Sequence, residues 1–489
     1  MPIELASRAD FTLAHFRRSA WQGEAVAFTE PALLRMAEAR AQFLGLIESE
    51  PDITIYGVTS GYGQHARLRY TPAERVVHAR KPPVGAYVAF GPPLPERVAR
   101  GIVFARLTNF VEGHAAVSPE LASAVAGLLA GEPLPKVSMT GQGGAGEITG
   151  LAPLFCGVAE RFELGEKEAL SLVNGSPCAS ALVADAALAA RRRLELAEEV
   201  FALSSEALTV PLGHFVEDLE DLWGDPAEAA TLASLRRLMA GGTTERRPYQ
   251  APVSFRVLPR VLAHFRRSTE AAENAATISL RAITDNPVFL PPQGEKKGRV
   301  FSTGGYHNAM AYPSMDNIAA AMADLCLLAD RHTSKLLDGR YSLLPDQLQQ
   351  GEGYLGCLGM VQVGYSEQAR RAAQRNFLPG SEGGGFGQND VAPPSFFSWR
   401  AQEEAGQCLE AALAMVAVVS SQAFFVTGRQ PPPALADLLT LTRRHVGPVT
   451  ASRVLAGELA KLAEAFRSRV FDVAPGLTGQ SFTPGARGF

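Results

Sequence analysis

Long stretches of apolar residues at helical spacing are the feature that most limits the folds open to this chain of 489 residues. Over Ala411–Phe425 the apolar side chains cover nearly the whole circumference of a helix. A helix of this kind is buried in a large bundle or at an interface between subunits. Strand-like alternation of apolar and polar residues is scarce, so the sequence predicts an all-α protein.

The same spacing predicts further helices along most of the chain. Pro177 lies inside the longest helical segment and is expected to kink or interrupt it, because proline lacks the N–H that a helix interior needs. The expected helices are Ala32–Ile47, Glu96–Glu112, Pro119–Leu129, Lys167–Leu208, Val257–Ile283, Met315–Leu337, Ser366–Arg375, Trp399–Thr427, Pro432–His445 and Ser452–Ser468.

Glycine- and proline-rich loops separate these helices. They cover Ile55–Gly63, Lys81–Pro95, Gly141–Gly150, Phe301–Pro313 and Leu378–Pro394. Loops on a rigid helical scaffold are where site residues concentrate. The last two loops are too long to be simple connectors, so we expect them to line a site or to form a lid.

Composition and charge exclude several classes of partner. The chain is 46% hydrophobic and 20% charged, with a net charge of −4, which favours neither nucleic acid nor an anionic membrane. Five scattered cysteines without a CxxC pair indicate reduced thiols and predict neither disulfides nor a metal site. The N-terminus lacks a signal pattern, and the apolar run Leu413–Val426 is too short to span a membrane. These features predict a cytoplasmic protein.

Two motifs carry a resemblance to a known family. They are IYGVTSGYG at Ile55–Gly63 and GQGGAGEITGLAPL at Gly141–Leu154. Together they resemble the histidine, phenylalanine and tyrosine ammonia-lyase family, with five motifs in consistent order from about residue 30 to about residue 400. The resemblance implies a mainly helical, ammonia-lyase/fumarase-like fold. In it, residues 1–200 carry active-site loops, and residues 201–489 form the central bundle and C-terminal helices of one integrated unit.

The second motif lacks the residue on which the family's chemistry depends. Family members carry Gly-Ala-Ser-Gly-Asp-Leu-Ala-Pro-Leu, whose Ala-Ser-Gly cyclises into methylideneimidazolone, an electrophilic prosthetic group. Alignment on Leu151–Leu154 places Glu147-Ile148-Thr149 at the triad, and alignment on Gly144-Ala145 places Gly146 at the serine. In a third register the serine is simply deleted. No register supplies the hydroxymethyl group whose dehydration forms the methylene, so the cofactor is expected to be absent.

Four residues are candidates for proton transfer. By the resemblance, Tyr56 acts over the α and β carbons of the substrate; the alternative is an aromatic plug in a turn. A phenol becomes a base only when its pKa falls from about 10, a shift that nearby helix N-termini are expected to cause here. Tyr306 and His307 lie in STGGYHN, which resembles Ser-Gly-Gly-Asn-Phe-His, and His307 is alternatively structural. Glu147 is a third auxiliary proton carrier.

Two of the substrate-binding candidates lie in QAPVSFR, which resembles the family's Gln-Asp-x-Tyr-Ser-x-Arg. Gln250 and Arg256 match it, whereas the second catalytic tyrosine of the family falls on Val253. Arg256 is expected to hold a carboxylate by a bidentate contact. Its alternative role is a salt bridge at the surface or between subunits.

Three further candidates complete the binding set. Asn174, in LVNGSP, matches the asparagine that faces the amino-acid part of the substrate, although Asn-Gly is also an ordinary helix-end signal. Asn389 stands where the family places a glutamate or glutamine near the substrate amine. The substrate-selecting position falls near Ala86–Tyr87 and lacks the histidine typical of histidine lyases.

The departures from the family lie in the catalytic set rather than in the scaffold. An enzyme lowers its barrier by about 8–23 kcal/mol, and one acid or base supplies only about 10²–10⁴-fold. We therefore expect a lyase without the prosthetic group that eliminates an amine-type leaving group from a carboxylate-bearing aromatic or heteroaromatic substrate, as in ergothionase-type betaine lyases. The alternatives are a non-catalytic homologue that binds an amino-acid-like ligand or a paralogue, and an enzyme of Michael-type addition or cyclisation. The resemblance also implies a homotetramer with sites shared between subunits.

Overall fold

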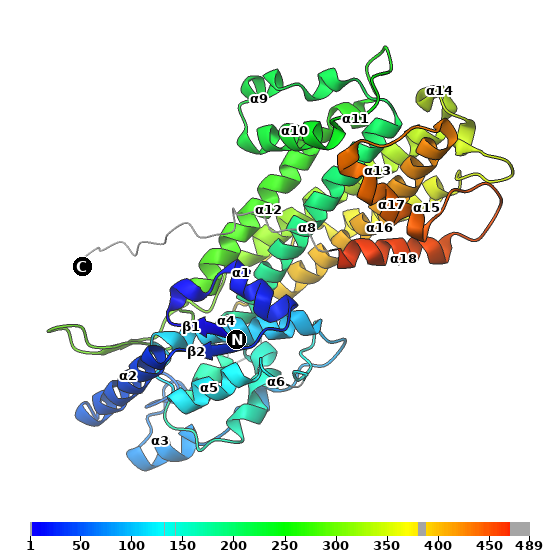
Figure 1. Ribbon diagram of the computed structural model, residues 1–489. Coiled ribbons are helices and arrows are strands. Elements are labelled where there is room, and N and C mark those ends of the chain that lie inside the picture. Colours follow the sequence, from blue (N-terminus) through cyan, green and yellow to red (C-terminus); the bar gives the residue numbers. More distant parts are fainter. Residues whose placement is uncertain (1, 132, 142, 380–387, 470–489) are drawn as a thin grey trace.

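The computed structural model describes residues 2–131, 133–141, 143–379 and 388–469, and these are mainly helical, as the sequence predicts (Figure 1). Two small sheets accompany the helices. Strand β1 (Ile3–Leu5) pairs in parallel with β2 (Val26–Phe28), and β3 (Val288–Leu290) pairs antiparallel with β4 (Arg299–Phe301).

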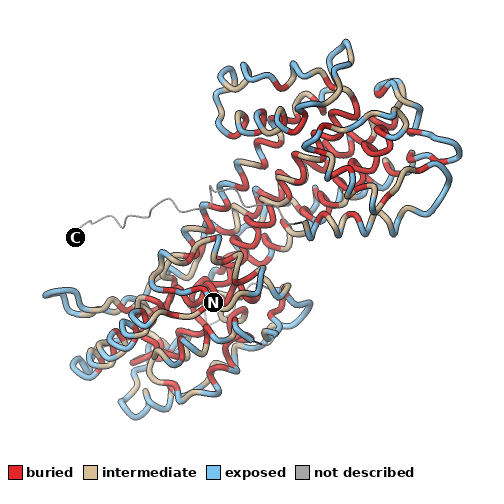
Figure 2. Tube along the Cα trace, viewed as in Figure 1, coloured by how far each residue is buried: buried red, intermediate tan, exposed pale blue. Residues whose placement is uncertain are grey.

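Four long helices form the central bundle and run side by side along the molecule (Figure 1). Their inner faces are buried, as the red stretches in Figure 2 show. Arg193 and Glu410 link two of these helices through a buried ion pair at 2.9 Å. The four helices are α8 (Pro177–Ala207), α12 (Leu258–Arg281), α13 (Ala311–Leu337) and α16 (Ser395–Thr427).

Shorter helices surround the two ends of the bundle (Figure 1). The N-terminal end carries α1 (Leu13–Phe16), α2 (Glu30–Ser49), α3 (Pro72–Ala79), α4 (Glu96–Val111), α5 (Pro119–Gly127), α6 (Ile148–Ala159) and α7 (Glu168–Val173). The other end carries α9 (Asp218–Trp223), α10 (Pro226–Met239), α11 (Val253–Arg256), α14 (Gly339–Ser342), α15 (Leu358–Ala372), α17 (Ala436–His445) and α18 (Ala456–Ser468).

The predicted interruption at Pro177 is confirmed. Helix α7 ends at Val173, and Pro177 is the first residue of α8, where its missing N–H is not needed. Helix α6 was not expected, because its glycines and the internal Pro153 disfavour a helix. It forms nevertheless, because nine of its twelve residues are buried and packing outweighs local propensity.

Two helical segments, at residues 168–207 and 395–427, are long and apolar enough to cross a membrane by length and composition. The apolar run Leu413–Val426 was predicted to be too short to span a membrane. That prediction does not hold for the complete helix, which covers residues 395–427. Both helices are largely buried against the rest of the bundle. Residue 200, the expected boundary between the two regions, lies inside α8, and the division stays a prediction.

Candidate active site

An open cavity of about 470 Å³ lies at the N-terminal end of the molecule and contains Tyr56. Asn174, Ile148 and Ala86 share its walls, so three of the motifs singled out in the sequence meet there. Much of the remaining wall is apolar or aromatic. The apolar and aromatic residues include Tyr62, Leu170 and Val173, and the wall also contains His78, Lys81 and Lys167.

Local hydrogen bonds shape the loop that carries Tyr56. Thr59 Oγ1 accepts from the N–H of Ile55 at 2.7 Å and donates to the carbonyl of Ile53 at 2.7 Å. Gly57 has φ +68°, so the turn favours glycine, and a Cβ there would also displace the end of the Leu170 side chain, whose Cδ2 would lie 2.6 Å away. The backbone N–H of Gly63 donates to Tyr56 Oη at 3.0 Å.

The environment of Tyr56 does not lower its pKa. Burial raises the pKa of the phenol above its ordinary value, and the hydrogen bond from Gly63 only partly offsets this effect. A nearby phenol, Tyr306, also acts in the raising direction. The expectation that helix N-termini lower this pKa is therefore wrong for the single chain. At neutral pH Tyr56 is protonated and can donate a hydrogen bond.

Glu147 lies beside the cavity, but it is not part of its wall. The residue has a left-handed backbone (φ +58°) directly before α6 and is 2% exposed. Its carboxyl oxygens accept from the backbone N–H groups of Cys178 at 2.6 Å and Ala179 at 2.8 Å, in the first turn of α8. Burial raises the pKa of Glu147 to about 8, although these donors and Arg106 favour the ionised form. The carboxyl thus joins the glycine-rich loop to α8.

Gly146 and Asn174 are in close contact. A Cβ at Gly146 would lie 2.7 Å from Asn174 Oδ1, and Gly146 has φ +74°. The backbone N–H of Gly175 donates to the carbonyl of Gly146 at 3.1 Å. Asn174 Oδ1 is buried and accepts no hydrogen bond from the described residues. The oxygen lies beside Gly146 and has almost no exposed surface, so in this conformation it does not face the open cavity.

A buried ion pair supports the floor of the cavity. Lys167 Nζ donates to Asp285 Oδ2 at 2.5 Å, to Ser171 Oγ at 2.7 Å and to the carbonyl of Ala115 at 2.9 Å. Both charged side chains are fully buried, and burial lowers the pKa of Lys167. Because all three ammonium protons are used, Lys167 serves the structure rather than a ligand.

The loop of Tyr306 and His307 lies between β4 and α13, and both residues are half-buried. Tyr306 is close enough to Tyr56 to raise the pKa of that phenol, so this loop approaches the cavity without forming part of its wall. Burial lowers the pKa of His307. The adjacent Asn308 is structural: its Oδ1 accepts from the N–H groups of Met310 and Ala311 at the start of α13.

Arg256 and Gln250 lie toward the opposite end of the folded molecule from Tyr56 (Figure 1). Arg256 ends α11, beside α10 and α12, whereas the Tyr56 loop lies next to α3 (Figure 1). Within the described part of the chain, Arg256 Nε donates to the carbonyl of Ala251 at 3.0 Å, and Gln250 is exposed. Val253 is 60% exposed beside them. A single chain therefore does not bring the expected carboxylate anchor to the cavity.

Tyr87 and Asn389 are the two remaining candidates. Tyr87 is half-exposed, and its neighbour Ala86 lines the cavity instead. Asn389 is partly buried and precedes α16, whose Phe396 packs against Gly150 of α6. Residues 380–387 of the expected lid lie outside the described residues.

Sequence reasoning missed the aromatic and cationic part of the cavity. His78 and Lys81 follow Tyr56 at no spacing that the family motifs specify, and they come together through α3. This helix had a recognisable start, because Thr71 and Glu74 form a capping box ahead of it. The box locates the helix, but it does not indicate which face meets the Tyr56 loop.

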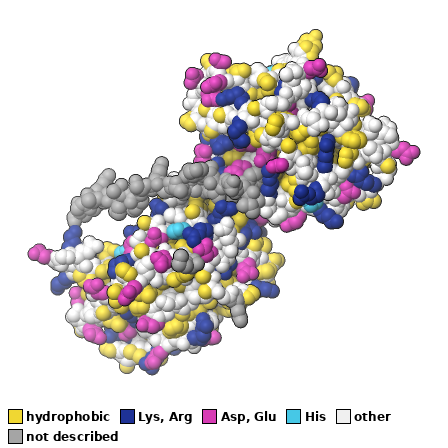
Figure 3. Space-filling view, in the orientation of Figure 1, with side chains coloured by type: hydrophobic (Ala, Val, Ile, Leu, Met, Phe, Trp, Pro, Cys, Tyr) yellow, Lys and Arg dark blue, Asp and Glu magenta, His cyan; other side chains and the backbone are white. Residues whose placement is uncertain are grey.

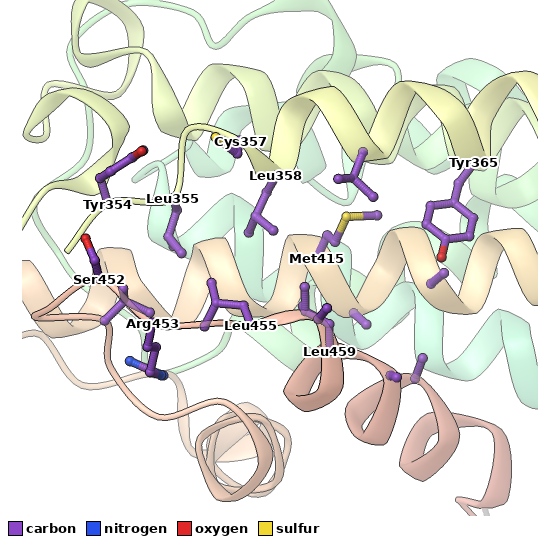
Figure 4. A pocket seen from close by; sticks show the side chains of 17 residues that line it. Tyr354, Leu355, Cys357, Leu358, Tyr365, Met415, Ser452, Arg453, Leu455 and Leu459 are labelled. Carbon is purple, nitrogen blue, oxygen red and sulfur yellow. The ribbon is translucent and has the colours of Figure 1, made fainter.

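A second open cavity of about 470 Å³ lies between α15, α16 and α18 (Figure 4). Its wall is mostly apolar, with Leu358, Met415 and Leu459 facing one another, and it contains none of the predicted site residues. On the face shown in Figure 3, acidic and basic side chains are interspersed. Of the predicted site residues, Tyr56 and Asn174 line the Tyr56 cavity.

Known proteins are similar to this chain in sequence and in fold. The histidine ammonia-lyase of Deinococcus radiodurans is 28% identical over 374 residues, 70% of each chain. Tyrosine aminomutase from Streptomyces globisporus has a similar structure, with a TM-score of 0.83, 24% identity and coverage of 96% of this chain and 97% of the other. Ergothionase from Treponema denticola gives 0.84 at 18% identity, over 94% and 97%. A family model described as aromatic amino acid lyase matches residues 11–444, and the chain therefore belongs to the aromatic amino acid lyase family.

Proposed function

We propose that this protein is a carbon–nitrogen lyase that acts without methylideneimidazolone. It eliminates an amine-type leaving group from a carboxylate-bearing aromatic or heteroaromatic amino-acid-like substrate. The observation that carries the proposal is the shared cavity of Tyr56 and Asn174, in which a phenol and an asparagine lie among apolar and aromatic walls.

The loop at residues 141–154 does not suit the family's prosthetic group. No register provides a serine. A side chain at Gly146 would collide with Asn174, and both carboxyl oxygens of Glu147 are engaged at the start of α8. Elimination by this chain must then rely on a substrate with a better leaving group or a more acidic carbon–hydrogen bond. We assign no step to methylideneimidazolone.

The residues of the cavity support binding and proton transfer. Asn174 lines the cavity and holds the amino-acid part of the substrate. The aromatic and apolar walls, including Tyr62 and Leu170, accommodate a planar ring. Tyr56 is at the reacting carbons as a protonated phenol, because burial keeps its pKa high.

The carboxylate anchor comes from another copy of the chain. Arg256 and Gln250 are remote from Tyr56 within one chain, and their guanidinium and amide groups are not enclosed. Large apolar side chains are exposed on and beside α15, including Met360 (78%) and Phe377 (75%), as expected of a surface that another subunit covers. These features favour a homotetramer whose active sites are shared between subunits. The cytoplasmic location of the protein stays a prediction.

Turnover of a substrate panel tests this function. Purified protein is incubated with aromatic amino acids and their trimethylated betaines, and ultraviolet absorbance detects the conjugated acid. We expect product from at least one betaine. Intact-mass measurement is expected to give the unmodified chain, and a loss of two waters from residues 141–154 would contradict the absence of the cofactor.

A non-catalytic role is the second candidate, favoured by the raised pKa of Tyr56. A binding protein needs only Asn174, the cavity and the anchor from another subunit. Saturable binding of a panel member without any product would identify this role.

A further inference from the structure

His332 is a fully buried residue that no sequence motif pointed to. It lies near the C-terminal end of α13 and is 0% exposed. Its ring stacks on that of Phe255 in α11, with the two centroids 3.6 Å apart and the planes at 15°. Phe201 of α8 meets the same ring nearly at a right angle, with the centroids 5.0 Å apart. His332 is therefore packed between α8 and the short helix that ends at Arg256.

Both ring nitrogens of His332 have a hydrogen-bond partner. Nε2 lies 3.2 Å from the carbonyl of Ser254, which can only accept, so Nε2 carries the proton and donates it. Nδ1 then presents a lone pair, and the hydroxyl of Ser204, 2.8 Å away, donates to it rather than to the carbonyl of Phe201. Burial lowers the pKa of His332 to about 3, so the ring is neutral at physiological pH. The ring is thus fixed at both nitrogens and holds the backbone of α11 through Ser254.

Arg256 is the residue of α11 whose side chain depends on this contact. It follows Ser254 by two residues, and its Nε donates to the carbonyl of Ala251 at 3.0 Å. The N–H of Ala251 donates in turn to His214 Nε2 at 3.3 Å, so the segment before α11 is fixed as well. With the residues that the structure describes, Nη1 and Nη2 of Arg256 form no hydrogen bond or ion pair. The guanidinium is therefore anchored at its base, and its outer nitrogens are left for a carboxylate.

We propose that His332 is a positioning residue for substrate binding, which holds α11 so that the outer nitrogens of Arg256 meet the carboxylate of the substrate. This inference rests on the proposed function, in which Arg256 is the carboxylate anchor for a cavity of another subunit. A bidentate contact requires the guanidinium and the carboxylate to lie in one plane. A small rotation of α11 therefore weakens the contact, although His332 itself touches no substrate.

The first test removes the ring nitrogens and keeps the ring. His332→Phe preserves the stacking on Phe255 and loses both hydrogen bonds, whereas His332→Gln retains an N–H donor of similar reach. Binding to the assembled protein is measured with cinnamate, an aromatic acid, and with its uncharged amide. In His332→Phe we expect cinnamate to bind about 10–100-fold more weakly and the amide to bind as in the wild type. His332→Gln should keep most of the preference for the acid.

Thr333→Val is the matched control. Thr333 is equally buried in the same turn of α13, and its hydroxyl has no hydrogen-bond partner among the described residues. This variant should bind both probes as the wild type does. On a panel member that the wild type converts, His332→Phe should raise KM by a similar factor with little change in kcat. The factor should stay constant from pH 6 to pH 9, because His332 is neutral throughout this range.

The two probes separate positioning from general damage to the core. Equal loss of affinity for both probes, or an unchanged preference for cinnamate in His332→Phe, would overturn the inference. Ser204→Ala leaves the ring in place and removes the hydroxyl at Nδ1, so it should lower the preference in the same direction even where His332→Phe does not assemble. A preference that Ser204→Ala leaves intact would count against His332 in the same way.

The wild type distinguishes this inference from the proposed function. A wild type that binds cinnamate no better than its amide would contradict Arg256 as the anchor and His332 as its positioning residue. A wild type that prefers cinnamate and converts no panel member would remove the lyase function alone, and the two probes would still decide the role of His332.

Discussion

The carboxyl group of Glu147 accepts a hydrogen bond from the backbone N–H of Cys178 at 2.6 Å, and this contact joins the degenerate cofactor loop to the start of α8. A helix N-terminus presents unpaired N–H groups and a positive partial charge, so it favours an acidic partner. Complete burial works against the charged form and raises the pKa of Glu147 to about 8. The loop is therefore held by a protonated carboxyl at neutral pH.

This contact predicts a pH-dependent stability. The folded pKa of about 8 lies above the ordinary value of 4.5, so the stabilisation is complete below pH 4.5 and is lost as the pH rises through 8. Each pKa unit corresponds to about 1.4 kcal/mol. Denaturant titrations from pH 5 to 9 should show the free energy of unfolding falling in the wild type and falling less in Glu147→Gln. Equal slopes would contradict the buried carboxyl.

The contact between Gly146 and Asn174 predicts that a side chain is not tolerated in the loop. Gly146→Ala combines a left-handed backbone with a steric clash, and it should cost about 1–3 kcal/mol of unfolding free energy. Gly141→Ala is the matched control, because Gly141 has φ +88° and nothing within 4 Å of a Cβ. The control should cost less. Gly146→Ser should likewise lose stability and keep its unmodified mass.

The buried pair Lys167–Asp285 predicts a large cost for removing one charge. Lys167→Met leaves Asp285 unpaired in the interior, and the free energy of unfolding should fall by about 3–5 kcal/mol. The double variant Lys167→Met/Asp285→Leu should recover part of this loss, because no unpaired carboxylate remains, while the buried Arg106 loses its main favourable charge interaction. A double variant that is less stable than Lys167→Met would contradict this expectation. It would show that the unpaired carboxylate is not the main source of the loss in unfolding free energy.

The separation of Tyr56 from Arg256 predicts complementation between subunits. Tyr56→Phe and Arg256→Ala should each reduce turnover, whereas tetramers reassembled from an equal mixture should regain about a quarter of the wild-type sites. A mixture of Tyr56→Phe and Asn174→Ala is the control, because both residues line the cavity of one chain. This control should regain nothing. Recovery in both mixtures, or in neither, would contradict sites shared in this way.

The sequence by itself determined the elements that depend on local patterns. Apolar spacing located the long helices, and Pro177 marked the start of α8, because helix periodicity and the missing N–H act within a few residues. The motif around Tyr56 and the absence of a serine at residues 141–154 were also visible in the chain. Family membership followed from these patterns.

Only the tertiary structure decided how the candidate residues meet. Glu147 contacts the start of α8, 31 residues later, and Lys167 pairs with Asp285 across 118 residues. The tertiary structure also placed His78 beside the Tyr56 loop and Arg256 toward the opposite end of the folded molecule (Figure 1). Such contacts, and the shifts in pKa that follow from burial, depend on how helices pack, and no local spacing in the sequence encodes that packing.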